Sequence, residues 1–381
     1  MKLRCAYRHI IPEGRSSCKY GHRLQDESNE SRDSGSVDLL LSQLSLLERA
    51  LTKERNKSAI IIEAIRSAAS ALPPVRLEKV PKSPREDPHT AMVDIGDVHL
   101  GELVDPVLTG GLSRYNRDIF YERGERFRQV FQHIVGIHRR AYPVEDLYVN
   151  LLGDIVTGEN VYHGQPFQID MPLLRQIFEG AHYFAGLIQD FSRTFKSVHV
   201  RCVAGNHGAE KDKHPLTNWD VAVYNLLEIL LSAQSNIDFE ISQSAFLIYQ
   251  VPGHDGFNHV LAHGNVRGWA SIPFYGFERL GASAQSMFGI PISFIHAGHI
   301  HNEAKWSSNR VRFLINGSWV GGSDLSVNKM VRNSLPTQSL FFCHPRQGIA
   351  ASYEIRLDDW TKMMTDSKGI YRPQNLHETA K

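Results

Sequence analysis

The sequence has little of several features that would place it in a specialised class of protein. Only four cysteines occur among 381 residues, at Cys5, Cys18, Cys202 and Cys343, and their scatter excludes a disulfide framework. No apolar run approaches the roughly 18–20 residues that cross a bilayer, so we expect no membrane span. The opening MKLRCAYRHIIPEG is charged and lacks an extended apolar segment, which argues against a signal peptide. We therefore expect a reducing, cytoplasmic location.

An excess of one charge is also missing. The 42 basic and 41 acidic residues give a net charge of +1, which excludes a strong overall attraction to polyanions. A nucleic-acid surface would therefore have to be a local patch. The composition, 42% hydrophobic and 22% charged, is ordinary for a globular protein, and the length suits one large domain with appendages or two modest domains.

Residues 1–36 are polar and predict an arm that buries little apolar surface. The arm contains two C-x3-H units, formed by Cys5 with His9 and by Cys18 with His22. These four side chains could close a tetrahedral zinc site and fold a segment that has no core of its own. A disordered arm without metal is the alternative interpretation.

Residues 37–72 have the apolar spacing of a helix, with four leucines at steps of four and three: Leu40, Leu44, Leu47 and Leu51. Such a helix could form a short coiled coil with a second copy, bind a replication or repair partner, or pack on the chain's own core. Five prolines then predict an extended linker over 73–90. We place a domain boundary near residue 90, a main domain over 91–361 and a solvated tail over 362–381.

In the main domain, apolar runs rich in β-branched residues alternate with longer helical stretches. We expect strands at Ala91–Ile95, Asp146–Leu152, Ser197–Ala204, His259–Ala262, Ser293–Ala297 and Val311–Ile315. We expect helices at Ile119–Arg140, Leu173–Phe195 and Trp219–Leu231. This alternation predicts an α/β domain with helices outside the sheets, and ligands in such domains gather at the carboxyl ends of strands.

Five short blocks follow these apolar runs and carry most of the chemistry. They are Asp97-Val98-His99, Gly153-Asp154, Gly205-Asn206-His207, His263-Gly264-Asn265 and Gly298-His299-Ile300-His301. Seven of their side chains can bind a metal: Asp97, His99, Asp154, Asn206, His263, His299 and His301. This is the ligand number of a two-metal site, which predicts hydrolysis of a phosphate ester. Nitrogen and oxygen ligands without thiolate suit manganese, iron, zinc or nickel.

His207 stands beside the ligand Asn206 and is the one block histidine left over. We expect it to donate a proton to the leaving oxygen or to hydrogen-bond the phosphorus group in the transition state. Each block alone is a weak signal, and Asn206-His207 by itself could be a capped turn. All five in order at strand ends are hard to explain by core packing. Asp94, His133, His138 and His199 are interpreted as core or surface positions.

The segments DVHLGE (97–102), GDIVTGEN (153–160), AGNHG (204–208), LAHGN (261–265) and AGHIH (297–301) resemble the calcineurin-like metallophosphoesterase superfamily. The resemblance runs from residue 91 to near residue 320. It implies a double β-sheet sandwich flanked by helices, here with an N-terminal arm and helix added. It also implies that two divalent ions, with manganese favoured, are held by two ligand sets: Asp97, His99, Asp154 and His301, and Asp154, Asn206, His263 and His299.

His207 matches the catalytic histidine of that superfamily, with one departure beside it. Gly208 stands where many members carry Asp or Glu, which would orient the histidine. Its absence leaves the orientation of His207 to another group, with Glu210 and Asp212 as candidates.

Two further segments favour a nucleic-acid substrate. The His-Leu-Gly after Asp97 resembles SbcD-type DNA exonucleases, and GDIVTGENVYHGQPFQID is similar to the exonuclease subunit of archaeal D-family DNA polymerase. The second likeness places Asn160, Tyr162, His163 and Gln165 on a loop beside the metals. Tyr162 could stack on a base or anchor its own loop.

A second loop is expected over 265–281, with Arg267 facing substrate phosphate. The aromatic residues of this loop would contact bases or cap the core beneath the site. The leading expectation is a nuclease that acts on DNA or RNA. A small-molecule phosphodiesterase or phosphomonoesterase, which the near-zero net charge favours, and a scaffold in a polymerase or repair complex are the alternatives.

Overall fold

The structure is a computed structural model that describes residues 41–46, 49, 69–80, 82–83, 87–159, 161–209, 217–254, 256–265, 273–329 and 331–358. The predicted zinc site at Cys5, His9, Cys18 and His22 and the predicted tail 362–381 lie outside these ranges. The chain divides into two compact units, Met1–Ala64 and Ile65–Lys381. Within the described ranges, no helix combines the length and the apolar character needed to cross a bilayer.

The described part of the predicted 37–72 helix agrees with the prediction at one end only. Residues 41–46 are helical and expose Leu41, Leu44 and Leu46, whereas residues 69–72 have no helical structure. Pro73 disfavours the helical conformation in the residue before it, which accounts for the difference.

The predicted linker is attached to the second unit along part of its length. The amide of Leu72 donates to the carbonyl of Leu230 over 2.7 Å, and the amide of Glu78 donates to the carbonyl of Arg193 over 2.7 Å. The linker thus belongs to the compact unit Ile65–Lys381, and the domain boundary near residue 90 stays a prediction. A proline-rich segment leaves its remaining amides outside regular structure, so they bond to the neighbouring helices instead.

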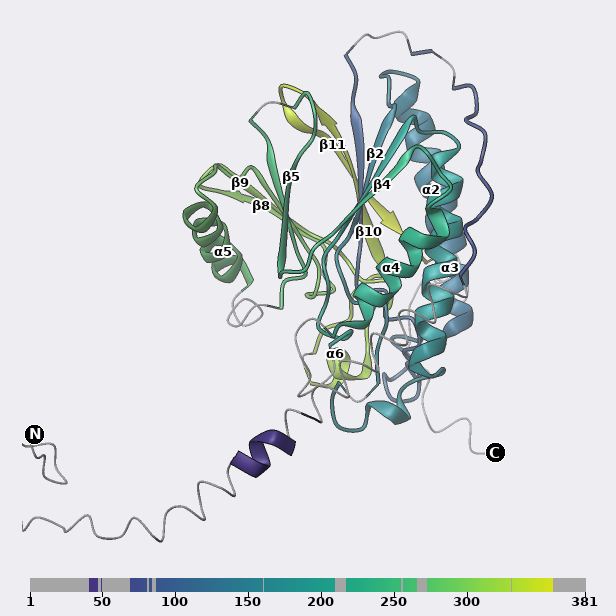
Figure 1. Ribbon diagram of the computed structural model, residues 1–381, viewed down its shortest axis with the longest axis vertical. Helices are drawn as coiled ribbons and strands as arrows, with labels where there is room; N and C mark the ends of the chain where they lie inside the picture. The colour runs from purple at the N-terminus through teal and green to yellow at the C-terminus, as the bar shows by residue number, and fades with distance from the viewer. Residues whose placement is uncertain are drawn as a thin grey trace, which may run out of the picture. The chain divides into compact units, whose positions relative to one another are not determined.

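Two β-sheets form the centre of the second unit (Figure 1). In the first sheet, the order is β11 (Gly348–Arg356), β10 (Thr337–His344), β1 (Thr90–Ile95), β2 (Asp146–Leu151), β3 (Ser197–Cys202) and β4 (Ile237–Ile241). In the second, the order is β5 (Phe246–Gln250), β6 (Asn258–Ala262), β7 (Phe294–Ala297), β9 (Val311–Ile315) and β8 (Ala304–Ser308). Strands β1 to β4 are parallel neighbours, as are β6, β7 and β9. The expected double sandwich is confirmed.

Helices cover the outer faces of the sandwich. On the side of the first sheet lie α2 (Arg117–Arg139), α3 (Leu173–Ser192) and α4 (Trp219–Leu231) (Figure 1). The shorter η1 (Gln165–Phe167) and α6 (Asp324–Asn328) belong to connections. Alternate strand residues fill the space between the sheets, among them Met92, Tyr148, Leu261, Phe294 and Phe341.

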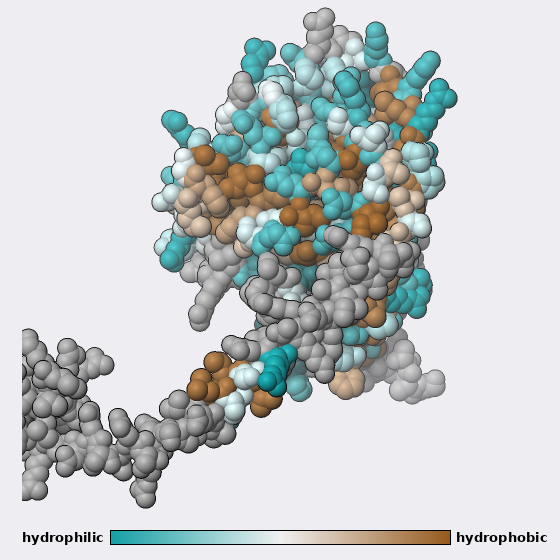
Figure 2. Space-filling model, in the orientation of Figure 1, coloured by the Kyte–Doolittle hydropathy of each residue, from teal (hydrophilic) through white to brown (hydrophobic). Residues whose placement is uncertain are grey.

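Helix α5 (Pro273–Phe288) covers the outer face of the second sheet and corrects the expectation of a loop over 265–281. Phe277, Leu280 and Ala284 recur at helical spacing and pack with the outward residues of that sheet. At its end, Met287 and Phe288 are exposed. Figure 2 shows hydrophobic residues gathered on the side of the molecule where Figure 1 places α5 and β5.

The opposite end of the first sheet from the five blocks holds a buried histidine pair. His89 Nδ1 lies 2.8 Å from His138 Nε2, and His138 stacks on Phe342. Burial, followed by the influence of His89, lowers the pKa of His138 to about 4. Between this value and the unfolded value near 6.5, the unfolded chain binds more protons, so acidification through this window removes stability.

We expect this one group to lower the free energy of unfolding by about 2 kcal/mol on going from pH 8 to pH 5. His138→Gln keeps a hydrogen-bonding partner for His89 and does not titrate, so its stability should fall correspondingly less. Urea unfolding of both proteins at the two pH values measures the difference. Equal losses in both proteins would contradict the assignment.

Candidate metal centre

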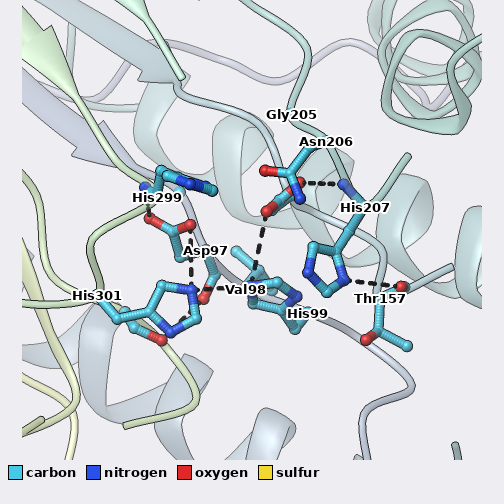
Figure 3. A network of polar contacts seen from close by, with 12 residues as sticks. Asp97, Val98, His99, Thr157, Gly205, Asn206, His207, His299 and His301 are labelled. Carbon is cyan, nitrogen blue, oxygen red and sulfur yellow. Dashed lines mark hydrogen bonds and ion pairs between the residues drawn. The ribbon is translucent and has the colours of Figure 1, made fainter. Parts of the chain in front are cut away.

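The seven predicted metal ligands meet at the carboxyl ends of the strands, where loops from both sheets approach each other (Figure 3). The loops after β1, β2 and β3 contribute Asp97, His99, Asp154 and Asn206 from the first sheet. The loops after β6 and β7 contribute His263, His299 and His301 from the second. Neither sheet alone carries a complete set, so the site depends on how the two sheets are placed against each other.

One group of ligand atoms forms around His301. Its Nε2 lies 3.1 Å from Nε2 of His99 and 3.4 Å from Oδ1 of Asp97. The ligand atoms of these three residues lie within 4.8 Å of one another. Two imidazole nitrogens and a carboxylate oxygen that converge in this way suit a divalent cation.

A second group forms around His263. Its Nε2 lies 3.0 Å from Oδ2 of Asp154 and 3.0 Å from Oδ1 of Asn206. His299 completes a set with Asp154 and His263 whose ligand atoms also lie within 4.8 Å of one another. Asp154 Oδ2 is 3.8 Å from His99 Nε2, so this carboxylate adjoins both groups.

The electrostatics of the second group favour a positive charge. Burial would lower the pKa of His263, but the charge of Asp154 and the hydrogen bond to it raise the pKa to about 10. The imidazole therefore keeps a proton at neutral pH when no cation is bound. A divalent metal ion held at Nε2 would require this nitrogen without its proton.

Five of the seven side chains stand on backbone in the left-handed region. Asp97, His99, Asp154, His299 and His301 have φ between 47° and 67°. This conformation costs an L-residue about 1–2 kcal/mol, so the surrounding structure holds it against a local preference. These unfavourable backbone conformations indicate that the directions of the ligand side chains, and not the backbone's own preferences, determine the loop shapes.

Neighbouring groups orient the ligands. The Nδ1 of His263 lies 2.7 Å from the carbonyl of Leu152, to which it donates, and this leaves Nε2 to face the site. The amide of His299 donates to Asp97 Oδ2 over 2.8 Å. Glu102 Oε2 lies 3.6 Å from His99 Nδ1, so this carboxylate adjoins a ligand from outside the two groups.

His207 forms a third group with His99 and Asp154, whose ligand atoms also lie within 4.8 Å of one another. Its amide donates to Asp154 Oδ1 over 2.7 Å, and its ring meets the ring of His99 edge-on, with centroids 4.4 Å apart. Its Nδ1 lies 3.1 Å from the carbonyl oxygen of Thr157 (Figure 3). The carbonyl accepts the Nδ1 proton and so keeps Nε2 available to a substrate.

The lack of space around residue 208 explains why a glycine stands there. A Cβ atom on Gly208 would lie 2.2 Å from Asn218 Oδ1, so no acidic side chain fits there. The Thr157 carbonyl takes the orienting position instead. Glu210 and Asp212, the candidates for that position, lie outside the described residues.

Asp220 is a buried residue of the site that sequence reasoning missed. It stands in the first turn of α4, and its carboxylate accepts the amides of Asp154, Ile155 and Gly205 over 2.8, 2.9 and 2.9 Å. The loops after β2 and β3 are thereby joined through one side chain. No local pattern marks such a residue, because its partners lie far from it in the sequence.

We expect Asp220→Asn to lower the free energy of unfolding by about 3 kcal/mol, because the new amide group would point its N–H toward backbone donors. Urea unfolding measures this loss, and Glu228→Gln on the exposed face of the same helix serves as the control. The control should change stability by less than about 0.5 kcal/mol. An Asp220→Asn protein as stable as the control would contradict the anchoring role.

The predicted substrate residues differ in their exposure and in their contacts. Tyr162 is partly exposed, with its ring centroid 6.3 Å from that of His207 and its hydroxyl donating to Gln168 Oε1 over 3.0 Å. His163 is exposed beside it. Gln165 is buried and bonds to the Thr157 carbonyl and the Val161 amide, so it supports the loop and does not face a ligand. Asn160 and Arg267 lie outside the described residues.

No family model matches the sequence, and no curated protein sequence matches it. Among solved structures, a conserved uncharacterised protein of Streptococcus pneumoniae described as a predicted phosphoesterase is similar, with 12% identity over 70% of this chain and 98% of that one and a TM-score of 0.28. Vps29 of Entamoeba histolytica complexed with Zn²⁺ has 14% identity over 70% and 99%, with a TM-score of 0.30. An archaeal phosphodiesterase has 10% identity over 70% and 99%, with a TM-score of 0.32.

Proposed function

We propose that the protein is a two-metal phosphodiesterase that cleaves nucleic-acid strands. The observation that carries this proposal is the convergence of two ligand groups, Asp97, His99 and His301 in one and Asp154, His263 and His299 in the other. These groups support the partition that the superfamily resemblance implies, in which Asp154 is shared between the two ions.

The donor set fits two divalent ions, which when bound supply Lewis-acid chemistry: they neutralise charge on the phosphoryl group and acidify water. The residues of the chain do the rest. His207 donates a proton from Nε2 to the leaving oxygen, and the Thr157 carbonyl stabilises the imidazolium through Nδ1. Asp154 holds His207 in place through its amide.

Tyr162 supports a nucleic-acid substrate. Its ring stands next to His207 and is partly exposed, so a base of the bound strand can stack on it.

We expect Tyr162→Ala to reduce oligonucleotide hydrolysis by a factor of about 5 to 150, the equivalent of the 1–3 kcal/mol that stacking on one base contributes. Tyr162→Phe keeps the ring and loses only the bond to Gln168, so it should retain most of the activity. Turnover of bis-(p-nitrophenyl) phosphate should be unchanged in both variants. Equal effects of Tyr162→Ala on the two substrates would contradict a stacking role.

A substrate panel tests the proposed function as a whole. Purified protein with Mn²⁺ is assayed on single-stranded DNA, single-stranded RNA, bis-(p-nitrophenyl) phosphate and p-nitrophenyl phosphate. We expect the oligonucleotides to be cleaved most efficiently and the monoester least. Preference for the monoester would overturn the nuclease proposal in favour of a small-molecule phosphatase, and no turnover of any ester by metal-loaded protein would favour a scaffold.

Self-association is a separate proposal, supported by the exposed Leu41 and Leu44, which lie one turn apart on the N-terminal helix. A helix with an exposed apolar face gains stability when a second copy covers that face. Light scattering of the full chain and of Leu41→Glu/Leu44→Glu should give a dimer and a monomer respectively. A monomeric unaltered chain at micromolar concentration would contradict this proposal.

A further inference from the structure

Beneath the candidate metal centre, four polar side chains form a layer inside the core between the sheets. Asp94, Asn150, His259 and His296 have no exposed surface. Asn150 Nδ2 donates to Asp94 Oδ1 over 2.8 Å, Asp94 Oδ2 lies 2.8 Å from His296 Nδ1, and His296 Nε2 lies 3.0 Å from His259 Nδ1. We call these four residues the polar layer.

Each member of the polar layer lies on a strand that leads into a ligand loop, three or four residues before a ligand. The pairs are Asp94 and Asp97 at β1, Asn150 and Asp154 at β2, His259 and His263 at β6, and His296 and His299 at β7. Two of these strands belong to the first sheet and two to the second. Every bond of the layer therefore joins two ligand-bearing strands.

The contact between Asp94 and His296 crosses from one sheet to the other. The core between the sheets is otherwise mainly apolar and includes Met92, Leu261 and Phe341. Apolar contacts have no preferred direction, so they allow one sheet to shift over the other at small cost. A hydrogen bond loses its strength steeply when its length or angle changes. The contact between Asp94 and His296, together with the hydrogen bond that Tyr249 on β5 donates to Asn150 Oδ1 over 3.0 Å, therefore determines one offset of the sheets.

Stability alone does not account for a buried polar pair in this place. Burying polar groups costs free energy that their hydrogen bond only partly returns, and apolar side chains of similar size often stabilise a core as well or better. The layer is also no path for protons to the metals, because His259 Nε2 is buried and has no hydrogen-bond partner among the residues the structure describes. The remaining function is to specify geometry.

We propose that the polar layer positions the metal centre by setting the offset of the two sheets. The first sheet delivers Asp97, His99 and Asp154, and the second delivers His263 and His299, so an error in the offset separates the two halves of the site. Asp94 and His296 are positioning residues that act through the strands. The inference rests on the proposed function in one respect, namely that metal ions bind at these ligands.

The test is Mn²⁺ binding by the full chain, measured by calorimetry and by the electron paramagnetic resonance signal of coupled Mn²⁺ ions. Asp94→Asn keeps the size and hydrogen-bonding ability of the side chain and removes its charge. We expect Asp94→Asn and His296→Gln each to weaken Mn²⁺ binding by about 10- to 100-fold, the effect typical of groups that orient metal ligands, and to alter the coupled signal. The double variant should bind no more weakly than the worse single variant, because both changes remove one interaction.

Ile295→Ala is the matched control. Ile295 neighbours His296 on β7 but points into the apolar core under α5. Its truncation should lower the melting temperature and leave Mn²⁺ affinity and the coupled signal unchanged. If Asp94→Asn and His296→Gln lose as much melting temperature as Ile295→Ala but bind Mn²⁺ as the unaltered chain does, the layer is only structural and the proposal is overturned.

A second variant and a second assay cover the remaining outcomes. Should His296→Gln fail to fold, the near-isosteric Asp94→Asn answers the question alone. Hydrolysis assayed on the same samples separates this inference from the proposed function. An unaltered chain that binds two Mn²⁺ ions but cleaves no phosphodiester would contradict the proposed function and would not contradict the positioning role of the polar layer.

Discussion

Asp154→Asn should reduce phosphodiester hydrolysis by a factor of about 1,000 or more, beyond the loss typical for a single transition-state contact. The carboxylate adjoins both ligand groups, with Oδ2 3.0 Å from His263 Nε2 and 3.8 Å from His99 Nε2. Its Oδ1 also accepts the amide of His207. One substitution therefore weakens both metal positions and releases the proton donor.

Turnover of an oligonucleotide and the metal content of the purified variant measure the two parts of this effect. We expect fewer than two Mn²⁺ ions per chain together with the loss of turnover. Asp118→Asn, at an exposed position in the first turn of α2, is the control and should match the unaltered chain. Hydrolysis by Asp154→Asn at the unaltered rate would contradict a shared carboxylate.

For His207→Gln, the expected loss is about 100- to 10,000-fold on oligonucleotides, the range that a positioned general acid contributes. The alkoxide that leaves a nucleic-acid strand needs a proton, whereas p-nitrophenolate is stable without one. The same variant should therefore hydrolyse bis-(p-nitrophenyl) phosphate with a much smaller loss.

Metal content should stay at the level of the unaltered chain in His207→Gln, because the seven ligands remain. His182→Gln on the exposed face of α3 controls for the loss of a histidine as such. An equally large loss of activity on both substrates would show that His207 does not act as the proton donor.

Long periodic elements could be predicted from the sequence, and short non-local ones could not. Helix α4 and strand β9 have the expected bounds, because their apolar residues recur regularly. Strand β10 escaped prediction, since it reaches its place beside β1 only through an antiparallel pairing with distant residues. The prediction of a loop where helix α5 lies was wrong. Phe277, Leu280 and Ala284 have helical spacing, but the neighbouring aromatic residues favoured the interpretation as a substrate loop.

The residues of the site likewise divide into those that a local motif reveals and those that act across the fold. The seven predicted ligands stand in short local motifs, which a sequence shows directly. The groups that support them act across the fold: Asp220 through the amides of Asp154 and Gly205, and the Thr157 carbonyl through a backbone atom that no residue type reveals. Asp94 was interpreted as a core or surface position, and its pairing with His296 could not be read from either segment.

The most direct test of the central claim is anomalous diffraction from crystals of the full chain soaked in Mn²⁺. We predict two anomalous peaks on either side of the Asp154 carboxylate, one ligated by Asp97, His99 and His301 and the other by Asn206, His263 and His299. A single peak away from Asp154, or no peak at these residues at saturating Mn²⁺, would contradict the account.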